Sequence, residues 1–280
     1  MTIHKLKYAS IADIGVFNLT FYDKSKEQEL VKFCKDNGIS YLPARDRKTV
    51  YQLFENGFQI CVLDDSFKIN PYERVFDVGT IEKFSCSDHN EVRFIMENEC
   101  IKGVVHIIDY NSEFLQVELY RAFFQFETRL RNLLVKHGKQ NKDFVQWVRG
   151  KYEQEKDENS KRYWENMLKK IDPVDEVKKE KVEYKMKETN PFQTFYLLDL
   201  LRFACNEGVI SKKHVNIDHV ARIRNLVAHS ISLTSRTEME EGSLVYNFDQ
   251  LKEYLQLIRS FFIAYDHLNE KVDEYVSKGV

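Results

Sequence analysis

The hydrophobic pattern of this 280-residue chain changes its period near Ser112, and that change limits the folds open to it. Before Ser112, short apolar runs bounded by Gly, Pro and Asp alternate with short amphipathic stretches, which is typical of mixed α/β structure. After it, apolar residues recur at three- and four-residue steps, which predicts helices. We therefore predict an α+β chain, with an α/β module over 1–112 and an all-α bundle over 113–280 that contains a charged segment at about 140–190.

The N-terminal part predicts two strand and helix units of similar size, which form a weak internal repeat. In the first unit a short amphipathic helix ends at Gly38, because Gly readily adopts the left-handed conformation that closes a helix. The predicted elements are a helix over 25–38, strands over 39–43, 57–63 and 80–84, a helix over 88–98, and a strand over 103–109.

Two segments of this part resemble a CBS motif. The segment Gly38-Ile-Ser-Tyr-Leu-Pro-Ala-Arg-Asp46 is similar to the middle of the motif, and Gly103-Val-Val-His-Ile-Ile-Asp109 is similar to its closing part. The resemblance implies a paired module that binds an adenine nucleotide as a regulatory ligand, with Asp109 at the ribose and His106 where the motif has a phosphate-contacting Thr. The first unit has no clear closing motif. Asp109 also has a simpler interpretation, as a cap for the helix that follows the strand.

The second part predicts a bundle of helices joined by short connections. The predicted helices cover 113–137, 161–171, 191–205, 217–230 and 249–275, with a polar loop over 231–246. Four aromatic side chains of the first helix are expected to serve core and dimer packing rather than base stacking: Tyr120, Phe123, Phe124 and Phe126. The charge run 178–187 predicts a solvated loop or helix edge; as an alternative RNA-guiding surface, it contains Glu residues that cancel the field of the Lys residues.

The helix over Ile217–Ser230 carries the residues with the most chemical content. Its apolar residues share one face, while Arg222, Arg224, Asn225 and His229 lie off that face. Arg224 and His229 are five residues apart, which is about 140° around an ideal helix. One helix therefore does not easily aim both at one phosphate, whereas a second copy across a two-fold axis brings the same patch there twice. The simpler interpretation is a surface helix whose Arg and His are solvated.

The word Arg224-Asn-Leu-Val-Ala-His229 resembles the Arg-Asn-x-x-x-His signature of the HEPN superfamily of all-helical ribonucleases and toxins, in particular its Abi-like branch. The resemblance implies an active site at a homodimer interface, RNA as substrate, 2′,3′-cyclic phosphate and 5′-hydroxyl products, and a role in phage defence or as a toxin. The segment Glu127-Thr-Arg-Leu-Arg131-Asn is similar to the first helix of Abi-like proteins, in which Glu and Arg-Asn point into the site. Glu127, Arg131 and Arg222 are therefore the expected supporting residues.

Metal-independent RNA cleavage needs a base for the 2′-hydroxyl proton and a cation to offset charge on the phosphate. The His229 imidazole is suited to the first task because histidine exchanges protons near neutral pH, and Arg224 can hold a phosphate bidentately. Asn225 can hydrogen-bond the phosphate or fix the His tautomer. We expect an endoribonuclease that uses these three residues, with no metal or required cofactor. The alternative is a non-catalytic, ligand-sensing and RNA-binding dimeric scaffold.

Composition limits the remaining classes. The chain has 42 Lys and Arg against 44 Asp and Glu, a formal net charge of -2, which excludes a strongly basic nucleic-acid coat but not a local basic groove. No apolar run is long enough to span a bilayer, and the first residues lack the apolar core of a secretory signal. The five cysteines are scattered and never spaced as Cys-x-x-Cys, which favours neither zinc nor disulfides. We therefore expect a cytoplasmic protein.

Overall fold

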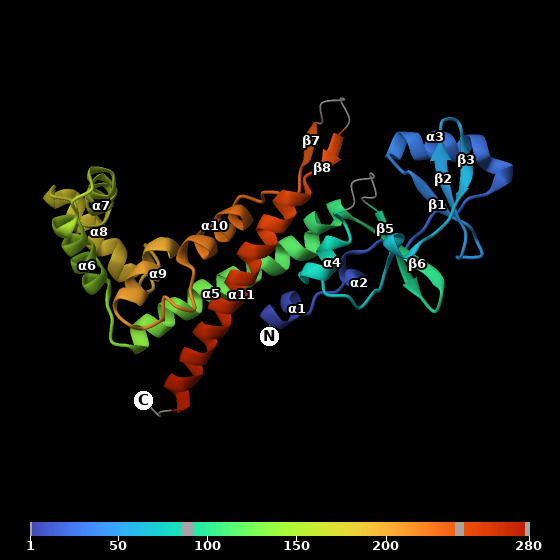
Figure 1. The fold of residues 1–280 in the computed structure, drawn as a ribbon. Helices are drawn as coiled ribbons and strands as arrows, with labels where there is room; N and C mark the ends of the chain where they lie inside the picture. Colours follow the sequence, from blue (N-terminus) through green and yellow to red (C-terminus); the bar gives the residue numbers. More distant parts are fainter. Residues whose placement is uncertain (1, 86–91, 239–243, 278–280) are drawn as a thin grey trace. The chain divides into compact units, whose positions relative to one another are not determined.

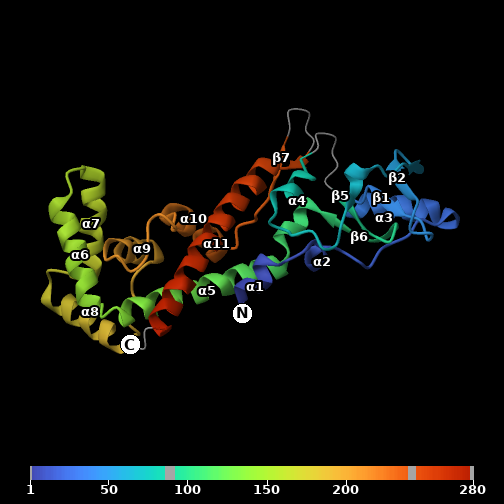
Figure 2. The same ribbon diagram turned by 60° about the horizontal axis from the view of Figure 1, so that its bottom comes forward.

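The computed structural model describes residues 2–85, 92–238 and 244–277. The chain is α+β, which confirms the predicted class: small sheets and short helices occupy the N-terminal part, and long helices dominate from Glu113 onward (Figures 1 and 2). It divides into two compact units. The first unit comprises residues 1–121 and 226–256, and the second unit comprises residues 122–225 and 257–280.

Short elements make up the N-terminal part. In chain order they are α1 (Thr2–Lys7), α2 (Ile11–Ile14), α3 (Glu27–Asn37), β1 (Tyr41–Pro43), β2 (Val50–Phe54), β3 (Gly57–Cys61), β4 (Lys68–Ile69), α4 (Val78–Glu82), β5 (Val92–Glu97) and β6 (Cys100–His106), with 3-10 turns at Lys24–Lys26, Asp65–Phe67 and Ile107–Asn111. As predicted, α3 ends at Gly38, which has a left-handed backbone (φ 64°).

These strands form two separate three-stranded sheets. The first has the order β1-β2-β3 and is antiparallel throughout. The Tyr22 N–H donates to the Pro43 carbonyl at 2.9 Å, so the stretch before α3 runs beside β1. The second sheet has the order β4-β5-β6, with β4 parallel to β5 and β5 antiparallel to β6. Both halves therefore contain an extended segment, a helix, a strand beside that segment, and an antiparallel strand.

A close backbone approach fixes the edge of the second sheet. Val16 and Val104 exchange two backbone hydrogen bonds of 2.7 and 2.9 Å. A Cβ atom on the neighbouring Gly103 would lie 2.8 Å from the Val16 carbonyl oxygen, closer than a side chain tolerates. Glycine is therefore required here for packing, which is one structural reason for the Gly of the segment 103–109.

Two predicted elements of this part are wrong. The predicted strand over 80–84 is helix α4 as far as Glu82 and a turn after it, and the buried Ile81 is three residues from the buried Phe84, a helical rather than a strand spacing. The predicted helix over 88–98 is strand β5 from Val92 to Glu97, and residues 88–91 lie outside the described residues. The charged residue Arg93 interrupts the apolar pattern expected of a buried strand. Its side chain is nevertheless fully buried and donates to the Val92 and Lys83 carbonyls.

Long helices make up most of the rest of the chain. They are α5 (Glu113–Lys136), α6 (Asn141–Gln154), α7 (Glu158–Ile171), α8 (Glu176–Glu188), α9 (Leu197–Asn206), α10 (Ile217–Ala228) and α11 (Phe248–Ser277). As predicted, α5 is a single long helix followed by a left-handed glycine, Gly138 (φ 73°). The predicted loop over 231–246 contains the short strands β7 (Arg236–Glu238) and β8 (Leu244–Tyr246), which pair antiparallel.

Stacked aromatic rings hold the second unit together. Phe123 of α5 stacks on Phe261 of α11, with ring centroids 3.9 Å apart, and Phe144 of α6 stacks on Phe195 at 4.0 Å. The expectation that four aromatic side chains of α5 serve packing holds for Phe123 and Phe126, which are buried. Phe124 and Tyr120 are 66% and 61% exposed, so they do not pack in the core of this chain, and their expected part in dimer packing stays a prediction.

The charge run 178–187 lies in helix α8, which has no buried residue and carries an Asp175 cap at its start, so the predicted alternative of a solvated helix edge is confirmed. One helix prediction in the second unit needs correction. The predicted helix over 191–205 begins only at Leu197, because Phe192 has a left-handed backbone (φ 64°) that a right-handed helix cannot contain. No helix in the described part of the chain is long and apolar enough to cross a membrane.

Candidate functional site

Helix α10 contains the residues of the Arg-Asn-x-x-x-His motif up to Ala228, and His229 follows it. Asn216 caps its start, because the Asn216 Oδ1 atom accepts a hydrogen bond from the backbone N–H three residues later at 3.1 Å. Val220 and Ile223 form the buried side of the helix, which leaves Arg222 and Asn225 exposed and Arg224 partly exposed. The predicted apolar face is buried at Val220 and Ile223 and half-buried at Ile217, Leu226 and Val227.

Arg224 is held by an ion-pair cluster that joins α5 and α10. The Arg224 Nε atom donates to Oε1 of Glu127 at 3.0 Å, and the Arg131 Nη2 atom donates to Oε2 of the same carboxylate at 3.0 Å. The side chains of Glu127 and Arg131 are 15% and 18% exposed, and that of Arg224 is 35% exposed. Two guanidinium groups thus share one carboxylate, which leaves the cluster with one net positive charge. The structure brings together three of the residues that the sequence singled out.

Arg131 also ties this cluster to the loop before α9. Its Nε atom donates to the Phe192 carbonyl at 3.3 Å, while the Phe192 N–H donates to Oδ1 of Asn141 at 2.8 Å. Phe192 is fully buried and has a positive φ, an unfavourable conformation that these two hydrogen bonds and the burial of its ring offset. Asn141 and Phe192 were not predicted as part of the site, because neither a helix-start Asn nor an apolar residue after Pro191 signals such a role.

His229 lies outside the helix on which its role was argued. Helix α10 ends at Ala228, and His229 and Ser230 form a turn in which Ser230 has a φ of 50°. The angle of an ideal helix therefore does not describe the placement of His229. Its side chain is exposed, and neither it nor Asn225 makes a side-chain hydrogen bond with the residues that the structure describes.

The side chains of His106 and Asp109 in the first unit are used locally. The Asp109 carboxylate accepts the His106 N–H at 2.7 Å, and the His106 Nδ1 atom accepts the Ile108 N–H at 3.1 Å, so the two residues cap the 3-10 turn after β6. Burial raises the pKa of the Asp109 carboxyl above its usual value, and the hydrogen bond from His106 opposes that shift. This arrangement matches the capping interpretation of Asp109.

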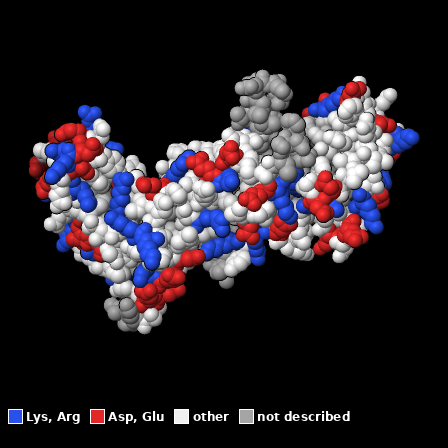
Figure 3. All heavy atoms as spheres, in the orientation of Figure 1, with Lys and Arg blue, Asp and Glu red and all other residues white. Residues whose placement is uncertain are grey.

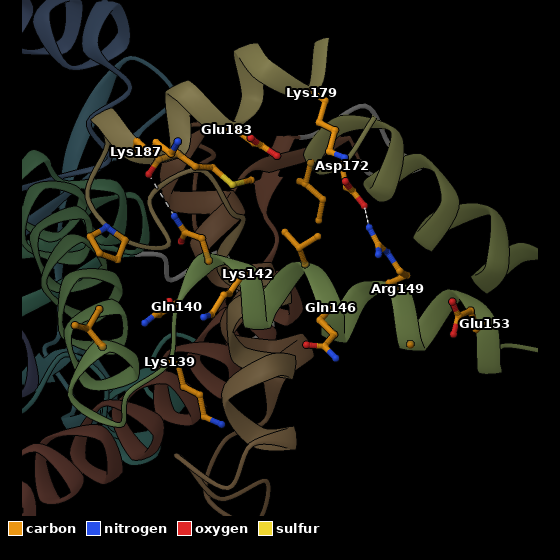
Figure 4. A pocket seen from close by; sticks show the side chains of 17 residues that line it. Lys139, Gln140, Lys142, Gln146, Arg149, Glu153, Asp172, Lys179, Glu183 and Lys187 are labelled. Atoms are coloured by element: carbon orange, nitrogen blue, oxygen red, sulfur yellow. Dashed lines mark hydrogen bonds and ion pairs between the residues drawn. The ribbon is translucent and has the colours of Figure 1, made fainter. Parts of the chain in front are cut away.

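Helices α6, α7 and α8 border a cleft in the second unit with a volume of about 980 Å³. Figure 4 shows basic and acidic side chains mixed along it: Lys139, Lys142, Arg149, Lys179 and Lys187 against Glu153, Asp172 and Glu183. Arg149 and Asp172 form an ion pair. The same mixture of signs covers much of the face that Figure 3 shows. The cleft therefore has only a weak net positive charge, as the composition of the charged segment predicted.

Within residues 2–85, 92–238 and 244–277, no three His, Cys, Asp or Glu side chains lie close enough together to hold a metal ion. Comparisons of the chain with protein-family models, with curated proteins and with solved structures found no match.

Proposed function

We propose that the chain is a metal-independent endoribonuclease of the HEPN type, in which Arg224, Asn225 and His229 act on the RNA backbone. The observation that carries the proposal is the shared ion pair of Arg224 and Arg131 with Glu127. It supports the proposal because the three interacting residues come from the two sequence segments that resemble Abi-like HEPN proteins, 127–132 and 224–229. Phage defence or toxicity as the biological role rests on the resemblance alone.

The ion pair suits Arg224 to phosphate binding. Its Nε atom is engaged by Glu127, and among the described residues no other hydrogen bond or ion pair holds the guanidinium. The two Nη groups therefore remain available to donate to a pair of phosphate oxygens, a geometry that the planar guanidinium favours. Glu127 fixes the direction of the side chain, and the partial exposure of Arg224 leaves it accessible to a polyanion.

The proposed reaction is an intramolecular transesterification, in which the 2′-hydroxyl of one ribonucleotide attacks the adjacent phosphate and displaces the 5′-oxygen of the next nucleotide. A general base removes the proton of the 2′-hydroxyl, and the 2′-oxygen forms a bond to phosphorus while the bond to the 5′-oxygen breaks. A general acid returns a proton to that leaving oxygen, so the products are a 2′,3′-cyclic phosphate and a 5′-hydroxyl. In this proposal His229 exchanges the proton and Arg224 stabilises the charge on the phosphate, with Asn225 as a further hydrogen-bond donor.

A homodimer belongs to the proposal through the resemblance. The angle around an ideal helix does not relate Arg224 to His229, because His229 follows the end of α10. A second His229 from the partner would provide both the base and the acid in one composite site. Sedimentation of the purified protein across its cleavage-active concentration range tests this part separately.

The direct test is cleavage of a fluorescently labelled RNA in EDTA by the full chain and by His229→Ala and Arg224→Gln. Loss of at least about a hundredfold in rate is expected for His229→Ala, because general acid–base catalysis contributes about that much or more. The matched controls are His137→Ala and Arg259→Gln, which alter an exposed His at the end of α5 and an exposed Arg on α11. Full activity of His229→Ala in a folded protein would refute the proposal.

The alternative, a non-catalytic RNA-binding scaffold, has its own outcome in this experiment. RNA that stays intact in every condition but binds the protein, with binding weakened by Arg224→Gln, would indicate a scaffold. Analysis of the cut ends separates the ribonuclease from a contaminant, because the proposed reaction leaves only cyclic phosphate and 5′-hydroxyl ends.

The proposal extends to the N-terminal part, residues 1–112, as a CBS-like regulatory module. The repeated order of extended segment, helix, strand and antiparallel strand supports it. The proposal places an adenine nucleotide at Asp109, where one oxygen of the carboxylate already accepts the His106 N–H. Titration calorimetry of the wild-type chain and of Asp109→Asn with AMP and ATP tests this binding. Heats no larger than those of dilution in both proteins would exclude the nucleotide.

A further inference from the structure

A cavity of about 650 Å³ in the second unit adjoins the Glu127 cluster. It lies between α5, the C-terminal half of α11 and the loop before α9. Arg129, Arg131 and Lys136 line it, and no carboxylate does. Amide side chains add hydrogen-bonding groups to the wall, among them Asn132 and Gln193. Because the whole chain has a net charge of -2, a lining whose charged side chains are all positive is a local feature and not a consequence of composition.

Two of the three cations that line the cavity, Arg129 and Lys136, are positioned without being neutralised, whereas Arg131 pairs with Glu127. The Arg129 guanidinium lies 5.4 Å from the Tyr265 ring and donates to Asn269, and the Lys136 Nζ atom lies 5.6 Å from the Tyr275 ring. Rings and amides hold a cation in place but leave its charge intact. Neither Arg129 nor Lys136 has a carboxylate within ion-pair distance among the described residues.

Arg131 connects the cavity to the proposed active site. Its side chain lines the cavity, and its Nη2 atom shares the Glu127 carboxylate with Arg224. A polyanion that contacts Arg131 in the cavity is therefore separated from Arg224, the residue proposed to hold the reacting phosphate, only by the Glu127 carboxylate that both arginines share. Phe124 also lines the cavity and is 66% exposed, although its neighbours Phe123 and Phe126 are buried.

We infer that this cavity binds the phosphodiester backbone of single-stranded RNA next to the cleaved bond, with a base stacked on Phe124. Cationic side chains that follow a backbone and an exposed aromatic ring that receives a base are the two components of single-strand recognition. A duplex does not offer an unstacked base to such a ring, so the occupant is single-stranded. The inference rests on the proposed function for RNA as the substrate, but not on His229 or on catalysis.

The test measures RNA binding in the His229→Ala background, where cleavage does not interfere. The probe is a fluorescein-labelled single-stranded RNA of about twelve nucleotides, and its anisotropy is followed from low to moderate salt. Each lost phosphate contact lowers the salt slope of log K by about 0.7, so Arg129→Gln with Lys136→Gln lowers it by about 1.4. Phe124→Ala weakens binding by about tenfold through the lost stacking while leaving the slope unchanged.

Matched variants separate this effect from damage to the fold. Lys181→Gln alters an exposed Lys on α8 outside the cavity and is expected to leave binding unchanged. Arg129→Lys keeps the charge and is expected to keep the salt slope. The tryptophan fluorescence of the folded state, from Trp147 and Trp164 in the second unit, verifies that each variant is folded.

The outcomes distinguish this inference from the proposed function. An unchanged salt slope in the folded double variant would overturn the cavity as a phosphate site, whether or not the wild-type chain cuts RNA. A lowered slope in a protein that never cuts RNA would support the cavity and refute the ribonuclease. Equal affinity for inorganic polyphosphate, with no effect of Phe124→Ala, would overturn RNA as its ligand.

Discussion

Replacing Glu127 by Gln tests the cluster that underlies the proposed function. The carboxylate accepts one charge-assisted hydrogen bond on each oxygen, from Arg224 and from Arg131, both at 3.0 Å. Gln keeps a single acceptor oxygen and turns an amide NH₂ toward the other guanidinium. The variant therefore loses at least one charge-assisted hydrogen bond, each of which contributes about 1.5–3 kcal/mol.

Solvent reduces this loss. The Arg224 side chain is 35% exposed, so water replaces part of the lost interaction, whereas Arg131 is only 18% exposed. We expect Glu127→Gln to lower the free energy of unfolding by about 1–2 kcal/mol, between the values typical of exposed and of buried ion pairs. The control is Glu165→Gln, which removes an exposed partner of Lys169 and is expected to cost less than about 0.5 kcal/mol.

A double-mutant cycle isolates the Glu127–Arg224 pair. Urea unfolding of Glu127→Gln, Arg224→Gln and the double variant is followed by tryptophan fluorescence. The chain has two Trp residues, and both lie in the second unit with the cluster, so the signal reports on that unit. We expect a coupling energy of about 1 kcal/mol. Single-variant effects that add within about 0.3–0.5 kcal/mol would show that the ion pair does not form, and the argument for an oriented Arg224 would fail with it.

Three further predictions concern the scaffold. Asn216→Ala removes the cap of α10 and should cost about 1 kcal/mol in urea unfolding, while an unchanged midpoint would argue against the cap. Phe144→Ala, which removes a fully buried stacked ring, should cost about 3–5 kcal/mol, whereas Phe124→Ala at an exposed ring should change stability little. Burial raises the pKa of Asp199, to which the Tyr163 hydroxyl donates at 2.5 Å, so the folded state binds this proton more tightly than the unfolded state does. Its contribution to stability is complete below the ordinary aspartate pKa of about 4 and is lost as the pH rises through the raised value, and Asp199→Asn should remove that decline in unfolding experiments between pH 4 and 7.

The candidate site could be predicted in part from the sequence. The cap at Asn216 and the buried face of α10 follow from local patterns, because a cap and an amphipathic face depend on residues within one or two turns. The spacing of Arg224 and His229 can be read directly from the sequence. The resemblance to Abi-like proteins directed attention to Glu127 and Arg131 on a second helix. The end of α10 before His229 was not predicted, and it changes the geometrical argument for the site.

Local sequence determined the elements whose signals are repeated along the chain. The long helices α5 and α11 carry apolar residues over many turns, and Gly38 and Gly138 adopt left-handed backbones that few other residues tolerate. These features require no knowledge of distant residues. The α+β class follows from them, since the change of period near Ser112 separates sheet-forming from helical segments.

Tertiary structure alone decided the elements whose polar groups find distant partners. Arg93 lies in a buried strand because distant packing encloses it and backbone carbonyls accept its hydrogen bonds, although its charge predicts an exposed position. Phe192 interrupts a segment with a helical pattern because Asn141 and Arg131 bind its backbone N–H and carbonyl from other elements. For Phe192 the partners are 51 and 61 residues away in the chain, and these hydrogen bonds outweigh the local preference once folding brings the partners within reach. For Arg93 the acceptors are nearer in the chain, and it is burial within the fold that overrides the preference of a charged side chain for solvent.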